Sequence, residues 1–228
     1  MLPLLTPTRN DYGYDVTGLV PGWESVLGAG DLGSEQQAIW DRAVGYLKVR
    51  SNDVHTIYSY GIAQALADLH PEAHPEVVLP AILLHDIGWS QAPEGEILDA
   101  IAPGGDRRDL IVLHEKEGAR LARGILQELG VEPSRVEAIL AIIDGHDTRR
   151  EAISLDDALV KDADKLWRLT PHGIDTVMGW FGLTRDEAHR LIGSRVHHHL
   201  LTDAGRTMAR ALAAVAWVDS SPQRVALG

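Results

Sequence analysis

The chain has 228 residues, 45% of them hydrophobic and 24% charged, a composition that suits one globular domain with a full core. It contains no cysteine, which excludes disulfides and thiolate metal ligands, and its formal net charge of −12 argues against a nucleic-acid polymer as the main partner. No apolar run reaches membrane-spanning length and the N-terminal stretch MLPLLTPTR is too short and too interrupted by proline for a signal peptide, so we expect a cytoplasmic protein with no membrane partner.

The chain divides by composition into an arm, a domain and a tail. Residues 1–33 are rich in proline and glycine and lack periodicity, which predicts an irregular N-terminal arm. A single helical domain is expected over residues 34–220, followed by a C-terminal tail over residues 221–228. No repeat or low-complexity linker divides this domain further. A homo-oligomer is compatible with the sequence, which leaves the oligomeric state open.

The first three helices are predicted from caps and apolar spacing. Ser34 with Gln37 resembles a capping box at the start of the first helix. Asp53 is predicted as the N-cap of a second helix over residues 54–69, which a proline then stops. A third helix is expected over residues 75–88, with a proline tolerated near its first turn.

Helices are also predicted for the rest of the chain. Residues 89–108 form a connection of about twenty residues, a length that is more often functional than idle in a compact domain. Helices are then expected over residues 109–129 and 133–144, each ended by a glycine. Four more helices begin after a hydroxyl-bearing N-cap: Ser154, Thr170, Thr184 and Thr202, the last helix ending near Val218. No segment alternates with the period of a strand for long, so an all-α fold is predicted.

A buried ionisable pair is the most unusual feature of the sequence. The segment PAILLHDIGW places His85 and Asp86 directly after an apolar run, where an unpaired charge is costly. Other ionisable residues lie beside apolar segments, about one helix and a turn apart: His55, His114, His146 and Asp164. Antiparallel helices with this spacing could each bring one of these side chains to a shared point.

Imidazole and carboxylate groups together suit Fe, Mn, Ni, Co or Zn better than Mg or Ca. Adjacent residues diverge by about 100° on a helix, so His85 and Asp86 could approach a metal from two angles, and the two oxygens of Asp86 could bridge two ions. We assign His55, His85, Asp86 and Asp164 to one divalent ion, and Asp86, His114 and His146 to another, with Fe or Mn favoured. Neither ion is then saturated by protein ligands, which leaves room for water and a small anionic substrate.

Some of these residues have other interpretations. His114 could be a hydrogen-bonded core histidine, and His146 could sit at a helix C-terminus, where an imidazolium is favoured. Asp162 could replace Asp164, because the apolar face of their helix does not separate them clearly. Asp147, the second residue of the other His-Asp pair, is expected to have a turn or capping role.

Three basic residues are assigned to substrate binding. Lys161 and Arg168 share a helix face with Asp164, and Arg149 lies just after the His146 segment, so each could meet an anion. A surface ion pair is the alternative for such residues. The run HHH at residues 197–199 points to three different faces of a helix, so it is expected to face solvent rather than to bind one ion.

The pattern resembles a known family. The H…HD…D signature of the HD-domain superfamily is matched, with LLHDIG as its most recognisable segment, by His55, His85, Asp86 and Asp164. The segment SLDDALVKDADKL is similar to the family's segment around the last aspartate, and two further residues match the extra histidines of its binuclear branches: His114 and His146. The resemblance covers roughly residues 50–170.

This resemblance implies a helical, metal-dependent domain, commonly a phosphohydrolase. The leading interpretation is hydrolysis of a small phosphoester or nucleotide, with Asp86 or Asp164 orienting the attacking water. Trp89 follows the HDIG segment where some signalling phosphodiesterases have lysine, and no GYP-type extension follows, which argues against a cyclic dinucleotide as substrate.

Two other functions fit the same ligands. Some members with this ligand set are mixed-valent di-iron oxygenases that cleave a C–C or C–P bond with O2, and Tyr12 and Tyr14 of the arm could close such a site. A non-catalytic module that senses a nucleotide is the third interpretation. The nearly intact ligand set argues against it, because a retired enzyme is expected to lose ligands.

Overall fold

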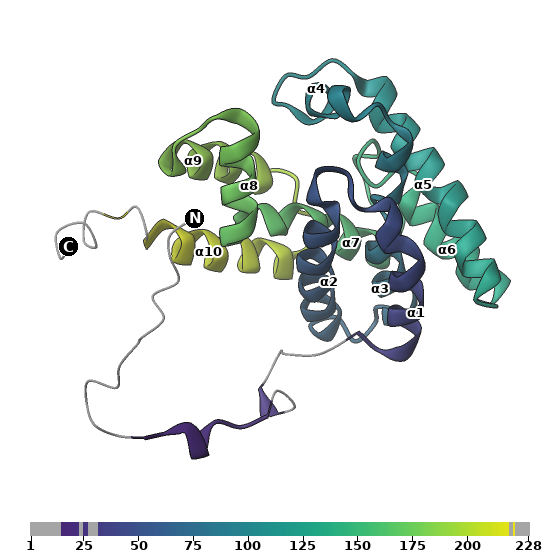
Figure 1. Ribbon diagram of the computed structural model, residues 1–228, viewed down its shortest axis with the longest axis horizontal. Coiled ribbons are helices and arrows are strands. Elements are labelled where there is room, and N and C mark those ends of the chain that lie inside the picture. The colour runs from purple at the N-terminus through teal and green to yellow at the C-terminus, as the bar shows by residue number, and fades with distance from the viewer. Residues whose placement is uncertain (1–14, 23–24, 27–31, 219–220, 222–228) are drawn as a thin grey trace. The chain divides into compact units, whose positions relative to one another are not determined.

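The computed structural model describes residues 15–22, 25–26, 32–218 and 221. Within these residues the protein has ten α-helices, several short 3₁₀ turns and no strand, which confirms the all-α prediction (Figure 1). The chain divides into two units, Met1–Leu32 and Gly33–Gly228, and all ten α-helices belong to the second. None of the helices in the described ranges combines the length and apolar character needed to cross a membrane.

Three helices form the centre of the helical unit: α2 (Asn52–Asp68), α3 (Pro75–Leu84) and α7 (Leu155–Leu166). Each of them packs against the other two, and Figure 1 shows them together in the middle of this unit. The residues of α3 from Val77 to Leu84 are all buried, so beyond its exposed first two residues this helix has no solvent-facing side. A short helix that is apolar all round is typical of the centre of a domain.

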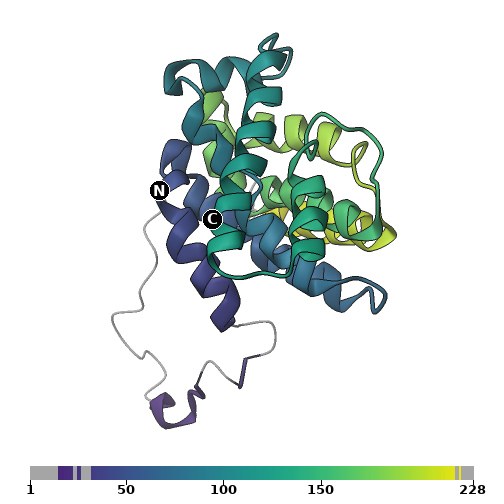
Figure 2. The same ribbon diagram turned by 90° about the vertical axis from the view of Figure 1, so that its right-hand side faces the viewer.

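The other helices cover this centre. On one side lie α5 (Arg108–Glu128) and α6 (Pro133–Ile143), which pack on each other and on α3 and face the viewer in Figure 2. The short α1 (Ser34–Ala43) contacts α3 and α5, and α4 (Ile97–Ile101) contacts α5.

The C-terminal helices pack around the end of α7. They are α8 (Pro171–Phe181), α9 (Arg185–Val196) and α10 (Asp203–Trp217). The α10 helix contacts both α7 and α9, and α8 contacts α9. This arrangement leaves the end of α7 between the α8–α9 pair and the segment that carries α4.

The four hydroxyl caps are confirmed. Each side-chain oxygen accepts a hydrogen bond from the backbone N–H three residues later, at Ser154, Thr170, Thr184 and Thr202. Thr184 forms a complete capping box with Glu187, because the Glu187 carboxylate also accepts the Thr184 N–H. These caps satisfy backbone donors that a helix leaves unpaired at its start.

The two caps predicted near the N-terminus are wrong. Ser34 is the first residue of α1, its side chain makes no capping bond, and the N-cap is Gly33. Asp53 lies inside the first turn of α2, because the helix begins earlier, at Asn52. The cause is a tight turn before α2, in which Arg50 and Ser51 both take left-handed φ angles of 55° and 57°.

The third helix and the connection after it also differ from the prediction. The α3 helix ends at Leu84 rather than near Gly88, and the chain continues as a 3₁₀ turn over Ile87–Gln91. The connection contains the short helix α4, which the sequence did not reveal. Gly88 is needed in this turn, because a side chain there would overlap the carbonyl oxygen of His114 and the backbone nitrogen of Gly118. The turn therefore lies directly against α5.

Candidate metal centre

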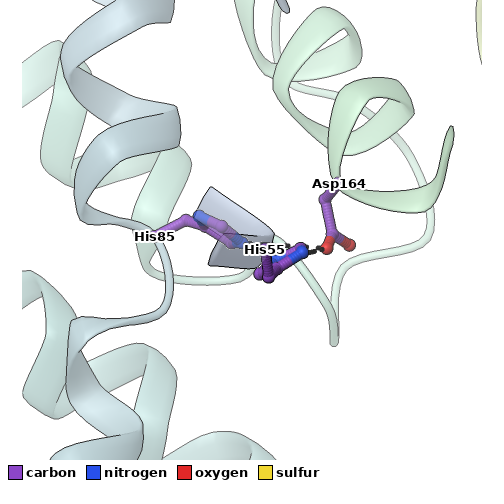
Figure 3. A group of neighbouring side chains, drawn as sticks. All are labelled: His55, His85 and Asp164. Carbon is purple, nitrogen blue, oxygen red and sulfur yellow. Dashed lines mark hydrogen bonds and ion pairs between the residues drawn. The ribbon is translucent and has the colours of Figure 1, made fainter. Parts of the chain in front are cut away.

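Four of the predicted ligands surround one point in the core. The Nε2 atoms of His55 and His85 lie 3.0 Å apart (Figure 3). Asp164 Oδ1 lies 3.5 Å from His55 Nε2 and 3.7 Å from His85 Nε2. Asp86 Oδ2 lies 3.4 Å and 3.6 Å from the same two nitrogens. These residues come from α2, the end of α3 and α7, which are the three central helices.

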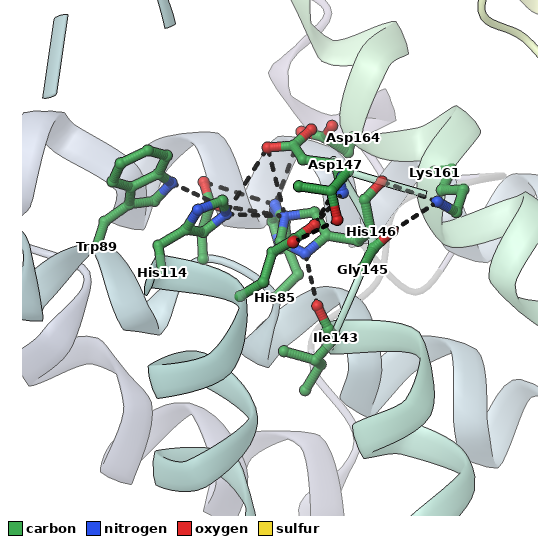
Figure 4. Close-up of polar contacts among 12 residues, drawn as sticks. His85, Trp89, His114, Ile143, Gly145, His146, Asp147, Lys161 and Asp164 are labelled. Atoms are coloured by element: carbon green, nitrogen blue, oxygen red, sulfur yellow. Dashed lines mark hydrogen bonds and ion pairs between the residues drawn. The ribbon is translucent and has the colours of Figure 1, made fainter. Parts of the chain in front are cut away.

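A second group adjoins the first (Figure 4). His114 Nε2 on α5 and His146 Nε2 after α6 lie 3.3 Å apart. They lie 3.8 Å and 3.6 Å from Asp86 Oδ1, the other oxygen of the same carboxylate. Asp86 thus presents one oxygen to each group, which is the geometry of a carboxylate that bridges two ions.

The spacing of the atoms fits two metal ions. Ligand atoms about 2.0–2.2 Å from one ion lie about 2.8–3.6 Å from one another. The distances above span 3.0–3.7 Å in the first group and 3.3–3.8 Å in the second, so they match this range or exceed it by at most about 0.2 Å. The donor set of imidazole nitrogens and carboxylate oxygens matches Fe, Mn, Co, Ni or Zn. The residues present therefore fit a pair of divalent ions.

The histidines are oriented by the backbone and by ring packing. His85 Nδ1 donates to the carbonyl of Ile82 at 2.8 Å, and His146 Nδ1 donates to the carbonyl of Ile143 at 2.9 Å. These bonds fix the tautomer in which the Nε2 lone pair points into the centre.

Trp89 supports the second group in two ways. Its ring stacks on His114, with centroids 3.9 Å apart and an interplanar angle of 8°. Its indole N–H donates to Asp86 Oδ1 at 3.1 Å. His114 Nδ1 is buried without a hydrogen-bond partner, so the stacked indole is what orients this ring. Trp89 therefore positions His114 and the Asp86 carboxylate together.

The loop after α6 is held from both sides. Glu115 is buried and accepts the backbone N–H groups of Asp147 and Thr148, both at 2.7 Å. Lys161 is 2% exposed, and its ammonium donates to the carbonyls of Gly145, His146 and Arg149. An acid and a base thus fix the loop that carries His146.

This placement corrects two of the assigned substrate ligands. All three N–H groups of the Lys161 ammonium are used inside the protein, so this residue stabilises the loop instead of facing an anion. The Arg149 guanidinium donates to carbonyls at the end of α6 and to Asp157. Their spacing in the sequence correctly placed both side chains near the site. However, backbone carbonyls accept the hydrogen bonds of Lys161, and carbonyls together with the buried Asp157 carboxylate accept those of Arg149, so fewer donors remain for an anion. All three residues line a cavity beside the cluster, but Arg168 alone of the three lies within 4.0 Å of a carboxylate of the predicted ligands, 3.8 Å from Asp164 Oδ1.

Asp147 belongs to the cluster, contrary to the turn or capping role expected for it. Its Oδ2 lies 3.7 Å from His114 Nε2 and 3.8 Å from His146 Nε2. Its side chain is 33% exposed, against 9% for Asp86 and 6% for Asp164, so it forms the solvent-facing edge of the centre. Asp162 points elsewhere and accepts hydrogen bonds from Leu201 and Thr202 at the start of α10.

The charges of the cluster shift the pKa values of its members. Burial lowers the pKa of His114 to about 4, and the neighbouring His146 adds to this effect. Burial acts on His146 in the same direction, but the carboxylates of Asp147 and Asp86 outweigh it and raise its pKa to about 9. Burial alone would raise the pKa of Asp86, yet the surrounding imidazoles, that of His85 first, hold it well below its usual range. The Asp86 carboxylate is therefore ionised.

The centre opens into two adjoining cavities. One, of about 320 Å³, has an apolar wall of α8 and α9 residues that includes Trp180 and Phe181. The other, of about 410 Å³, is lined mainly by polar and basic residues. Asp147 and Arg168 line both cavities, and so does Lys165, whose ammonium lies 3.7 Å from Asp164 Oδ2.

Arg50 is a further basic residue that sequence reasoning missed. Its guanidinium lies 5.1 Å from the ring centroid of Trp89 and 5.3 Å from that of Trp180. Its Nε is buried without a hydrogen-bond partner. Burial lowers the pKa of Arg50, and the carboxylate of Asp86 opposes this shift. The left-handed turn that brings Arg50 to this place has no signature that spacing alone could show.

Tyr12 and Tyr14, the residues expected to close an oxygenase site, lie outside the described residues.

Comparison with known proteins gives one match. The family model described as HD domain matches residues 52–169, slightly more than half of the chain, and this range contains all the residues of the two groups. Neither a curated protein nor a solved structure matches.

Proposed function

The chain belongs to the HD domain family, and on that premise we propose that it is a metal-dependent hydrolase of a small phosphoester, built around a binuclear centre. One observation carries the proposal: the two oxygens of Asp86 face two different pairs of imidazole nitrogens, beside cavities that open to solvent. The residues that would hold the ions are His55, His85, Asp86, His114, His146 and Asp164.

Two divalent ions at these ligands supply Lewis acidity, which lowers the pKa of water and neutralises charge on phosphoryl oxygens. The residues of the chain provide the remaining requirements. Asp147 is the most exposed carboxylate of the cluster, so we assign it to accept the proton of the attacking water as the water oxygen bonds to phosphorus. The P–O bond to the leaving group then breaks, and the leaving oxygen takes up this proton from Asp147 and departs as an alcohol. The Asp86 and Asp164 side chains are only 9% and 6% exposed, so we assign them to hold the ions rather than to move protons.

The phosphoryl group would meet basic side chains at the mouth of the centre. Arg168 and Lys165 both line the cavities and lie near Asp164, and Arg50 lies between two tryptophans with donors to spare. Arginine donors match phosphoryl oxygens in a planar fork, and fixed donors stabilise the charge that develops in the transition state. A focused positive field of this kind favours a compact anion even in a protein whose net charge is −12.

The proposal is tested by phosphate release without oxygen. Protein loaded with Mn²⁺ or Fe²⁺ under anaerobic conditions should hydrolyse p-nitrophenyl phosphate or other small phosphoesters, and Asp164→Asn should abolish the activity. Asp156→Asn is the matched control, because Asp156 lies on the same helix but binds His74 outside the cluster. Oxygen consumption with an organic substrate by di-iron protein, with no phosphate released from a broad panel of esters, would replace the hydrolase by the oxygenase.

A further inference from the structure

Most arginines in the described part of the chain have a carboxylate partner. Ion pairs within 4.0 Å are formed by Arg42, Arg107, Arg120, Arg123, Arg135, Arg149, Arg168, Arg185, Arg190 and Arg206. This is expected in a protein with an excess of acidic residues. The described arginines without such a partner are Arg50, Arg108, Arg150, Arg195 and Arg210.

Three of these unpaired arginines line one cavity. Arg108 begins α5, Arg150 follows the loop of His146, and Arg195 lies near the end of α9. All three line the cavity of about 410 Å³ that adjoins the metal centre. The elements that carry them are distant in the sequence, so the fold has brought three uncompensated charges to the same space. Like charges around one cavity favour the binding of an anion between them.

The acidic residues of the centre do not account for this cluster. Lys165 and Arg168 lie within 4.0 Å of Asp164 and already balance it. Asp147 is the one carboxylate among the residues that line this cavity, and it faces the histidines of the second group. Bound metal ions would neutralise these carboxylates further. The net positive charge around the cavity would then increase, and with it the attraction for an anion.

The cavity also has space for a ligand and is continuous with the reaction site. Asp147, Arg195 and His199 line it and also line the neighbouring cavity with its apolar wall. A molecule whose reacting end lies at the metal centre could therefore extend its organic body along Trp180 and place its other end among the arginines. Figure 1 shows the α4 segment and the α8–α9 pair, which contribute to these walls.

We propose that Arg108, Arg150 and Arg195 form a second anion subsite, which binds a non-reacting phosphate or carboxylate of the substrate. The assignment of the reacting end rests on the proposed function, but the subsite itself does not. The substrate is thus an organic phosphoester that carries a second anionic group at a distance from the scissile bond. A substrate without this group should bind weakly and react with the same chemistry, so the difference should fall mainly on KM.

Binding to metal-free protein tests the subsite apart from activity. Inorganic pyrophosphate should bind the wild-type protein in calorimetry, and higher salt should weaken it because the arginines are exposed to solvent. Arg150→Ala and Arg195→Ala should each lower the affinity by about threefold to tenfold. Arg210→Ala is the matched control: it removes an arginine that is also unpaired but lies on α10 away from the cavity, and affinity should not change. Equal affinity in all three variants and the wild type would overturn the subsite.

Turnover then identifies the group that the subsite takes. Metal-loaded protein is given an alkanediol monophosphate, the corresponding bisphosphate and the corresponding ω-carboxyalkyl phosphate. The subsite predicts a KM at least about tenfold lower for one or both of the doubly anionic esters, and a loss of this advantage in Arg150→Ala. The same KM for all three esters would refute the subsite while leaving hydrolysis intact. Phosphate release from none of them would refute the proposed function, and pyrophosphate binding would still decide the subsite.

Discussion

Replacing Trp89 by phenylalanine separates the two contributions of this residue to the metal centre. The phenyl ring retains the stacking on His114, whose ring lies 3.9 Å away, but it lacks the N–H that donates to Asp86 Oδ1 at 3.1 Å. A buried hydrogen bond to a charged acceptor contributes about 1.5–3 kcal/mol. At about 1.4 kcal/mol per factor of ten, metal affinity should fall by roughly tenfold to a hundredfold. Losses of this size are typical when a residue that orients a metal ligand is changed.

The loss of metal affinity in Trp89→Phe should concern one of the two ions. Asp86 Oδ1 faces His114 and His146, so the ion at the second group should dissociate more easily, while two ions still bind at saturating metal. Calorimetric titration of metal-free protein with Mn²⁺ resolves the two affinities. Trp167→Phe is the matched control, because the Trp167 ring packs against His55 at 4.5 Å but its indole N–H has no acceptor. Equal losses in both variants, or none in Trp89→Phe, would refute the bridging arrangement.

Three further predictions concern the cluster and its loop. Asp86→Asn should reduce the metal content, measured by mass spectrometry, from two ions per chain to one or fewer, because an amide lacks the second oxygen that a bridge needs; two ions at full occupancy would contradict it. Lys161→Met should destabilise the protein by about 2–4 kcal/mol in urea titration, because three carbonyls lose their donor, whereas the exposed Lys116→Met should change stability by less than about 0.5 kcal/mol. Metal affinity should rise as the pH increases from 6 to 8, because His146, whose pKa is raised to about 9, must lose its proton to bind an ion; a pH-independent affinity would mean that this ring is not a ligand.

Much of the fold was predictable from local patterns. The hydroxyl caps that begin α7 to α10 act over three residues, so the sequence shows them directly. The convergence of the histidines and aspartates was also predictable, because apolar runs fix which face of each helix is buried and short connections bring such faces together. The start of α2 was not, since it depends on the left-handed turn at Arg50 and Ser51, which neither residue type favours.

The details of the site depended on contacts that span the chain. Lys161 was expected at the mouth of the site, but the loop after α6 offers its ammonium three carbonyls, and periodicity along one helix cannot reveal such a loop. The same loop turns the Asp147 carboxylate toward the two histidines of the second group. Trp89 was noticed only for replacing a lysine, whereas its position between Asp86 and His114 comes from the close approach of Gly88 to α5.

The number and coupling of the bound ions decide whether the Asp86 carboxylate holds two metals at once. Metal-free protein should take up two Mn²⁺ ions per chain, and their electron paramagnetic resonance should show exchange coupling, because one carboxylate faces both groups and places the ions a few Å apart. The wild-type protein should give a coupled signal at two equivalents, replaced in Asp86→Asn by the six-line signal of isolated Mn²⁺. Saturation at one ion per chain, or two ions with uncoupled spectra in the wild-type protein, would contradict the binuclear centre.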